Sequence, residues 1–100
     1  MRPIHLVDLD KPRPALILTR PEVRSVLNQV TVAPIVSRRR GIRTEVPVGS
    51  SNGLDHDSVV NCDSIGTVAA DKIGPQIGWL LASQEAALRA AIIAAFALEV

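Results

Sequence analysis

The chain has 100 residues, with eleven Lys or Arg against ten Asp or Glu, and its net charge is +1 at neutral pH. This length predicts a single domain, residues 1–100, and the near-zero charge gives no overall argument for a nucleic-acid partner. The single cysteine excludes an internal disulfide, and no stretch is long and apolar enough for a signal peptide or membrane span, so we expect a cytoplasmic protein without a membrane partner.

The charges are divided unevenly along the chain. Residues 1–50 carry nine Lys or Arg and four Asp or Glu (+5), whereas residues 51–100 carry two and six (−4). Such asymmetry points to a face that binds a polyanion. The alternative is that both halves are simply solvated.

The N-terminal third predicts two strands and a short helix. Pro3–Leu9 has the pattern of a first strand, and the near-continuous apolar run Ala15–Thr19 predicts a central strand buried on both faces. Pro21–Leu27 predicts one helical turn, because a proline followed by an acidic residue is favourable at a helix start.

Two alternating apolar and polar runs, Gln29–Val36 and Ile42–Val48, flank a cluster of arginines. Alternation at period two with a glycine between the runs predicts a stiff β-hairpin. Guanidinium groups stay charged and match phosphate oxygens with two donors, so a rigid tip that carries them suits a polyanion. The arginines at this tip are Arg38, Arg39, Arg40 and Arg43.

Strand parity predicts which side chains face the core. In the second arm of the hairpin we expect Thr44, Val46 and Val48 to face inward. Arg43 and Glu45 would then face solvent. The following segments are predicted as a loop and two strands: Gly49–Asp57, Ser58–Asp63 and Gly66–Ala70.

Near the C-terminus the apolar period changes to 3.6, which predicts helices. A first helix would carry one apolar face made of Ile73, Ile77, Leu80 and Leu81, and Ser83 is the predicted N-cap of a second helix. Because Ala86–Leu98 is apolar nearly all round, this helix needs cover on more than one side, and we predict a homodimer. The alternative is an Ala-rich helix that packs one face on a sheet.

Strands followed by a helical C-terminus predict an all-β to α+β fold, a small barrel with appended helices. No Ser/His/Asp or Cys/His arrangement can be defended. His5 and His56 form no ligand pattern with Cys62, so we expect neither a metal site nor a cofactor. The residues by themselves therefore predict a small strand-rich dimer with a basic hairpin.

Three segments, in the same order along the chain, resemble MazF/PemK/Kid-type toxins of bacterial toxin–antitoxin modules. The family's opening Asp, loop, Arg-Pro and apolar run is similar to VDLDKPRPALILTR. Its third strand and following hairpin are similar to VTVAPIVSRRRGIRTEVPV, and its block Ser-x-Val-x-x-Asp-x-Ile-x-Thr to LDHDSVVNCDSIGTVAADKIG. The resemblance implies an SH3-like barrel with a long C-terminal helix, paired as a homodimer.

The implied activity is metal-independent, sequence-specific cleavage of single-stranded RNA, including mRNA. In that reaction the 2′-OH attacks the adjacent phosphate and leaves a 2′,3′-cyclic phosphate and a free 5′-OH. The family's Arg of the Arg-Pro pair falls on Arg13, which we predict as the phosphate stabiliser and a proton donor. The family's second catalytic residue, a Thr, falls on Val36, so we predict that the neighbouring Ser37 takes its place. Ser37 points away from the Val36 face in a regular strand, and this role therefore requires a bulge.

RNA contacts are expected from residues around this site. Kid-like relatives use an Arg and an Asp that flank the Cys of a later strand; here the Arg position holds Asn61 and the Asp is kept as Asp63. The loop between Asp10 and Arg13 is shorter than usual in the family. The predicted RNA-binding residues are Lys11, Arg38, Arg39, Arg40, Arg43, Asn61 and Asp63.

The resemblance also implies a cognate antitoxin whose acidic disordered tail folds into the RNA groove. Two alternatives stay open. The first is a dimer of the same architecture that binds RNA without cleaving it, an alternative that rests on Val36 at the position of the family's catalytic Thr. The second is a gyrase poison of CcdB-like type, although the chain ends Leu98-Glu99-Val100 where such chains end Trp-Gly-Ile.

Overall fold

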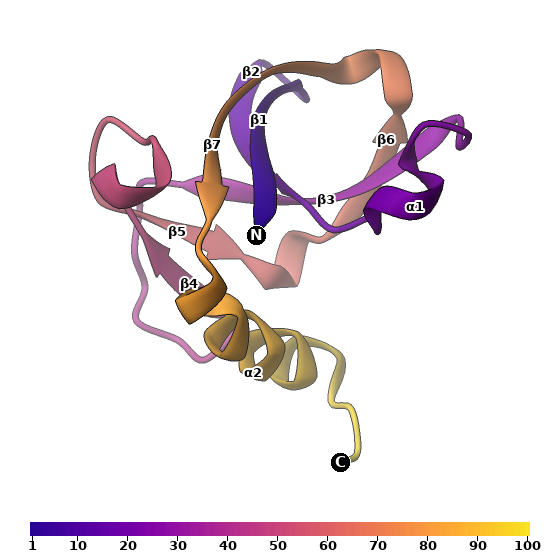
Figure 1. Cartoon of the computed structure of the whole chain (residues 1–100). Coiled ribbons are helices and arrows are strands. Elements are labelled where there is room, and N and C mark those ends of the chain that lie inside the picture. The colour runs from indigo at the N-terminus through magenta and orange to yellow at the C-terminus, as the bar shows by residue number, and fades with distance from the viewer.

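The computed structural model describes residues 1–100 as a curled antiparallel sheet followed by one helix (Figure 1). The strands are β1 (Arg2–Asp8), β2 (Pro12–Ile17), β3 (Gln29–Val36), β4 (Glu45–Val48), β5 (Ser58–Asn61), β6 (Gly66–Ala69) and β7 (Ile73–Leu80). The α-helices are α1 (Pro21–Arg24) and α2 (Glu85–Phe96), and four 3-10 turns are η1 (Ser50–Asn52), η2 (Cys62–Ser64), η3 (Ala70–Lys72) and η4 (Ala82–Gln84).

Strand β3 organises the sheet, whose order is β4-β5-β3-β2-β1-β7. On one edge β3 pairs with β2, and on the other it pairs with β6 along its first half and with β5 at its end. The sheet therefore curls into a half-barrel, and α2 packs near β4 (Figure 1). The predicted architecture, a small strand-rich barrel with a C-terminal helix, is confirmed.

The apolar run of β2 is buried on both faces, as predicted. Leu16 belongs to the larger core cluster, which also contains Leu88 of α2. Ala15 and Ile17 face the other way into a smaller cluster with Val30 of β3. A strand with no solvated face needs no polar alternation, which is why its sequence is continuously apolar.

The predicted hairpin between β3 and β4 is wrong. These strands do not pair with each other, because β5 lies between them and pairs Val60 with both Ile35 and Val46. Period-two alternation identifies strands but does not choose their partners. The arginines lie in the connection between β3 and β4, residues 37–44, which we call the arginine loop.

The predicted solvent exposure of Glu45 is also wrong, since its side chain is only 3% exposed. Glu45 lies on the face of β4 opposite to Val46 and Val48, as strand parity predicts, but the backbone of the arginine loop covers it. The buried carboxylate is satisfied by backbone N–H groups of the arginine loop. Val46 and Val48 face the core as predicted.

The helix predicted over Ile73–Leu81 is a strand, β7, which pairs with β1. Gly74, Pro75 and Gly78 disfavour a helix interior. Proline lacks an N–H but is tolerated in an edge strand. Two register shifts insert extra residues into β7, so its inward apolar side chains are not spaced by two and imitate a helical period.

Helix α2 begins later than predicted. Ser83 lies in η4, and the N-cap is Gln84, whose Oε1 accepts the Leu81 N–H at 2.9 Å. Within the protomer α2 buries Leu88 and Ala91 on the sheet, half-buries residues 92–95, and exposes most of its first two turns. Neither α-helix has the length and apolar character needed to cross a bilayer.

Candidate active site

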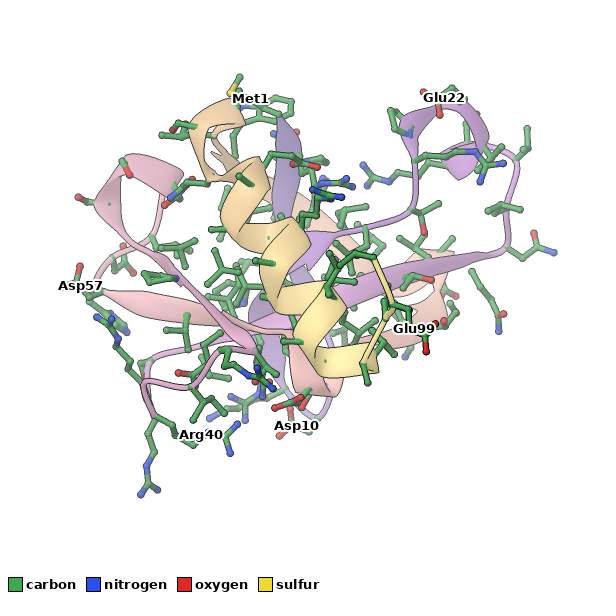
Figure 2. The ribbon with its side chains drawn as sticks, turned by 90° about the horizontal axis from the view of Figure 1, so that it is seen from below. Met1, Asp10, Glu22, Arg40, Asp57 and Glu99 are labelled. Carbon is green, nitrogen blue, oxygen red and sulfur yellow. The ribbon has the colours of Figure 1, made fainter.

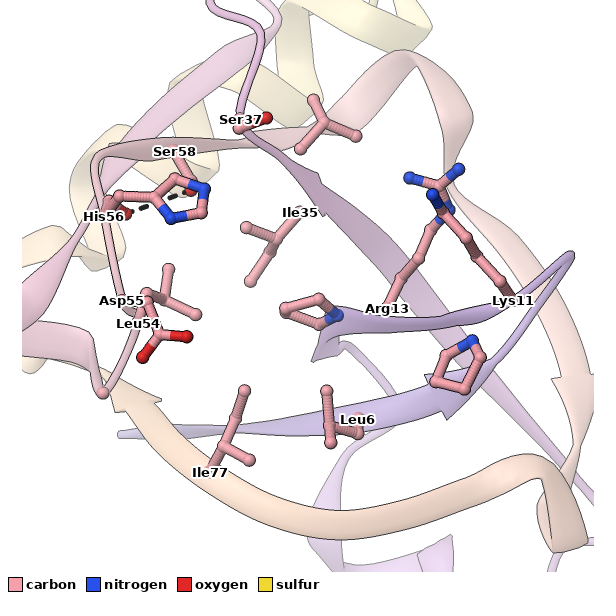
Figure 3. A pocket seen from close by; sticks show the side chains of 14 residues that line it. Leu6, Lys11, Arg13, Ile35, Ser37, Leu54, Asp55, His56, Ser58 and Ile77 are labelled. Carbon is pink, nitrogen blue, oxygen red and sulfur yellow. Dashed lines mark hydrogen bonds between the residues drawn. The ribbon is translucent and has the colours of Figure 1, made fainter.

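A pocket of about 370 Å³ opens where β2 and β3 face the loop that follows η1 (Figure 3). Its floor is apolar and includes Leu6, Ile35 and Ile77. Arg13 and Lys11 lie on one side, while Asp55 and His56 lie on the opposite side (Figure 3). The pocket therefore combines an apolar floor with charged and polar walls.

Arg13 is placed on β2 between two prolines, which fix the backbone on both sides of it. Its Nε donates to Asp10 Oδ1 at 2.8 Å, and its Nη2 donates to Asp10 Oδ2 at 3.0 Å. This two-pronged pair fixes the plane of the guanidinium group. Nη1 has no protein partner, so its donors remain for a ligand.

The pair also affects the protonation of both groups. The Arg13 guanidinium holds the pKa of Asp10 well below its usual range, mainly through these hydrogen bonds. Asp10 in turn raises the pKa of Arg13. Arg13 is therefore positively charged and held in one orientation.

Ser37 lines the same pocket as Arg13, together with Val36. The predicted role of Ser37 requires a bulge that brings it to the same face as Val36, but β3 has no bulge here. Instead β3 ends at Val36, and Ser37 is the first residue of the arginine loop, where strand alternation no longer holds. Ser37 also borders an adjoining polar hollow of about 480 Å³.

The predicted RNA-binding residues lie in four different places, one of which is the turn at η2. Lys11 lines the pocket, and Arg39 lines the adjoining hollow. Arg38, Arg40 and Arg43 are exposed on the arginine loop and line neither cavity. The structure thus brings Arg13, Lys11 and Ser37 together and leaves most of the basic cluster at the margin.

Asn61 and Asp63 lie outside the pocket and form part of the turn at η2. Asn61 Oδ1 accepts the Asp63 N–H at 3.0 Å, and its Nδ2 donates to Ser64 Oγ at 3.1 Å. Asp63 Oδ2 accepts the Thr44 hydroxyl at 2.6 Å. These bonds connect η2 to the end of the arginine loop.

The sequence interpretation did not find the opposite wall of the pocket, formed by Leu54, Asp55, His56 and Ser58. These residues follow a polar turn, and nothing in their spacing marks them. The wall is placed by backbone contact, because a Cβ on Gly53 or on Gly78 would overlap the facing backbone of β7 or η1. Gly53 also has a φ of +85°, which glycine adopts at no steric cost. No group of three or more His, Cys, Asp or Glu side chains is arranged to hold a metal ion.

Comparisons with known proteins agree with this architecture. Residues 4–96 match the family described as PemK-like, MazF-like toxin of type II toxin–antitoxin system. The chain is 58% identical to Endoribonuclease MazF3 of Mycobacterium tuberculosis over 99 residues, which cover 99% of this chain and 96% of that protein.

Two solved structures extend the comparison. The Mycobacterium tuberculosis toxin MazF-mt6 superposes with a TM-score of 0.97 at 56% identity and covers 99% of this chain and 100% of its own. A mycobacterial endoribonuclease in complex with its cognate antitoxin superposes with a TM-score of 0.86 at 25% identity, covering 98% of this chain and 94% of its own. The three segments that suggested a toxin family thus lie within a match that spans nearly the whole chain. The chain belongs to the PemK-like, MazF-like toxin family of type II toxin–antitoxin systems.

Proposed function

We propose that this chain is the endoribonuclease toxin of a toxin–antitoxin module and that it cleaves single-stranded RNA, mRNA included, at specific sequences. The observation that carries the proposal is the shared pocket of Arg13 and Ser37 in a chain 58% identical to a protein named an endoribonuclease. The pocket and the margin of exposed arginines together suit a strand that carries a phosphate at every nucleotide.

The reaction needs no cofactor in this proposal. The 2′-oxygen of the substrate attacks the adjacent phosphorus and loses its proton. The bond from phosphorus to the 5′-oxygen breaks, and the 5′-oxygen gains a proton. The products are a 2′,3′-cyclic phosphate and a 5′-OH, so atoms and charge balance.

Arg13 stabilises the negative charge that develops on the phosphoryl oxygens. Its Nη1 donors are unused within the protein, and Asp10 holds the guanidinium plane before substrate binds. We assign Arg13 to electrostatic stabilisation, because the pair with Asp10 holds the guanidinium in place and leaves Nη1 free.

Proton transfer then needs another group. His56 is the imidazole on the pocket wall opposite Arg13 (Figure 3), and imidazole is the commonest proton carrier in enzymes. We assign proton transfer to His56 and substrate contact near the reacting phosphate to the Ser37 hydroxyl.

The same proposal includes the partners of the chain. An antitoxin with an acidic disordered tail would occupy the basic groove in place of RNA. A structural relative was solved in complex with its cognate antitoxin, which supports this partner. The toxin acts as a homodimer in the cytoplasm, where RNA is available.

The deciding experiment incubates the purified chain with a long single-stranded RNA in EDTA and maps the cut sites by primer extension. We expect discrete cuts that leave 5′-OH and 2′,3′-cyclic phosphate ends. RNA binding without any cut indicates the non-catalytic alternative. Inhibition of gyrase with neither binding nor cutting indicates the CcdB-like alternative.

A second measurement tests Ser37 separately. Ser37→Ala is expected to slow cleavage, and Ser37→Thr, which keeps a hydroxyl, to retain most of it. Normal cutting by Ser37→Ala removes Ser37 from the site. Val36→Thr restores the hydroxyl at the position where the family has Thr, and this variant shows whether the family's arrangement is faster in this pocket.

A further inference from the structure

The arginine loop is held from inside by one carboxylate. Glu45 Oε1 accepts the backbone N–H of Gly41 at 2.9 Å and that of Arg40 at 3.0 Å, with a longer contact from Ile42 at 3.4 Å. The Glu45 N–H in turn donates to Ile42 O at 3.1 Å, which closes the turn. Three successive amides therefore converge on a side chain that is 3% exposed.

A positive φ permits this convergence. Gly41 has a φ of +70°, and a Cβ there would meet nothing within 4 Å, so backbone conformation and not space selects glycine. A buried carboxylate is costly unless it is hydrogen-bonded. Here burial raises the pKa of Glu45, but the amides of Arg40, Ile42 and Gly41 and the charge of Arg40 outweigh it, and the pKa lies below its ordinary value.

A second anchor fixes the other end of the loop. The Thr44 hydroxyl donates to Asp63 Oδ2 at 2.6 Å, and the Cys62 N–H donates to Thr44 O at 3.0 Å. The loop is thus tied to β4 by Glu45 and to η2 by Thr44.

The side chains of the loop divide into two kinds. Arg40 is partly used by the anchor, with its Nε 3.6 Å from Glu45 Oε2. Arg38, Arg39 and Arg43 form no salt bridge within the chain. The loop therefore presents three uncommitted guanidinium groups on a backbone that is already ordered.

We propose that Glu45 is a positioning residue for RNA binding, whose carboxylate orders the arginine loop so that Arg38, Arg39 and Arg43 meet phosphates without further immobilisation of the backbone. This inference rests on the proposed function. Glu45 does not contact RNA itself and acts through the loop. Ordering a binding loop in advance removes part of the entropic cost of association.

Replacement of Glu45 by Gln separates this idea from simple electrostatics. The substitution adds one positive charge to the protein and releases Arg40, so charge alone predicts tighter RNA binding. Loss of loop order predicts weaker binding. Glu22→Gln is the matched control, since it makes the same chemical change at an exposed carboxylate on α1, which lies far from Arg40 in Figure 2.

The measurements are Kd for a 2′-deoxy-substituted, uncleavable RNA oligonucleotide, KM and kcat for its cleavable form, and hydrogen exchange of the Arg40 and Gly41 amides. For Glu45→Gln we expect Kd and KM to rise about tenfold or more, kcat to stay within about twofold, and both amides to lose protection. Glu22→Gln should match the wild type in all of them.

The outcomes separate the two proposals. If the wild type neither binds nor cuts RNA, the proposed function fails. If the wild type cuts and Glu45→Gln binds RNA as tightly or more tightly, Glu45 is no positioning residue and the function stands. Should Glu45→Gln not fold, Glu45→Asp decides instead, because it keeps the charge but shortens the reach of the carboxylate to the amides of Arg40 and Gly41; an unchanged Kd for that folded variant also overturns the inference.

Discussion

The neighbours of Arg13 fix both its backbone and the orientation of its guanidinium group. Its backbone is fixed by the flanking prolines, and its guanidinium group uses two of its three nitrogens to bind Asp10. Because that pairing fixes the guanidinium plane, the direction of the remaining nitrogen, Nη1, is also fixed. Charge, orientation and protonation state are therefore set together.

We predict that Arg13→Ala lowers kcat by about 10²–10³-fold, because it removes a preorganised donor to the developing charge. Arg13→Lys should recover only a small part of the loss, since an ammonium group keeps the charge but cannot form the two-pronged pair with Asp10. Initial rates on a defined RNA measure both variants. Circular dichroism and the thermal midpoint should stay close to wild type; an active Arg13→Ala contradicts the assignment.

For His56 we predict a loss of kcat with little change in KM when it is replaced by Gln, because glutamine keeps polarity but cannot carry a proton. The expected decrease is about 10²–10⁴-fold. A kcat close to the wild-type value in His56→Gln shows that His56 does not transfer protons. The nearby Asp55→Asn, on the same pocket wall, is a suitable control.

Part of this site was predictable from the sequence and part was not. The Arg-Pro pair identifies Arg13 in the sequence. Ser37 was chosen because it follows Val36, the position where the family has Thr. His56 comes to the pocket only because the loop after η1 rests on β7, a contact between segments more than twenty residues apart that no local spacing reveals. Ser37 lines the pocket without the bulge that its predicted role required, since the strand ends at Val36, and its role in the reaction stays a prediction.

At the scale of elements, the residue that follows helix α2 has a backbone conformation that is unfavourable for a residue with a Cβ. Ala97 has a φ of +51°, and its N–H donates to Ala94 O at 3.3 Å. The Leu98 N–H donates to Ile93 O at 3.0 Å. This is a Schellman motif with alanine at the left-handed position where glycine is usual.

Accordingly, Ala97→Gly should raise the free energy of unfolding by about 1 kcal/mol, because glycine adopts the left-handed conformation without the Cβ penalty. Ala90→Gly, an exposed position inside the same helix, should lower it by a similar amount. Urea unfolding at constant protein concentration measures both. Equal effects of the same sign would contradict the assignment of strain to Ala97.

The sequence pattern predicts most strands and the C-terminal helix but fails where long-range pairing decides the structure. Local pattern found β1, β2, β3, β5, β6 and the C-terminal helix. It failed for β7, whose register shifts against β1 break the period of two. It also failed for the pairing of β3 and β4, since the partner of both, β5, comes later in the chain.

For the whole molecule, stability should fall in acid. Hydrogen bonds from Arg13 lower the pKa of Asp10, hydrogen bonds from Arg2 lower that of Glu85, and for Glu45 backbone amides outweigh burial. Each folded carboxylate then binds fewer protons than its unfolded form, whose pKa is 3.8 for Asp and 4.5 for Glu. Their stabilisation is complete above these values and is lost as the pH falls through the depressed folded values.

The urea midpoint should therefore change little between about pH 7 and 5.5 and decrease below about pH 4.5. Glu85→Gln should flatten that decrease, because it removes one of the titrating groups. A midpoint that rises on acidification contradicts the sign of these shifts.

Association of two copies is the second prediction at this scale. Trp79, Phe96, Leu98 and Val100 are large apolar side chains left 43%, 54%, 51% and 97% exposed in the protomer. We expect sedimentation velocity to show a dimer at micromolar concentration, and Phe96→Asp to shift it toward monomer. A wild-type chain that stays monomeric at high concentration contradicts the predicted pairing.

The contact of Gly53 and Gly78 has a consequence for genetics. Neither residue has a side chain, yet any larger residue at either position would push the His56 wall away from Arg13. If expression of the intact chain is lethal, colonies that survive random mutagenesis should repeatedly carry substitutions at these two codons. Such survivors would still make a protein that folds over most of its length. Neither glycine carries a polar side chain that would mark it as part of the site.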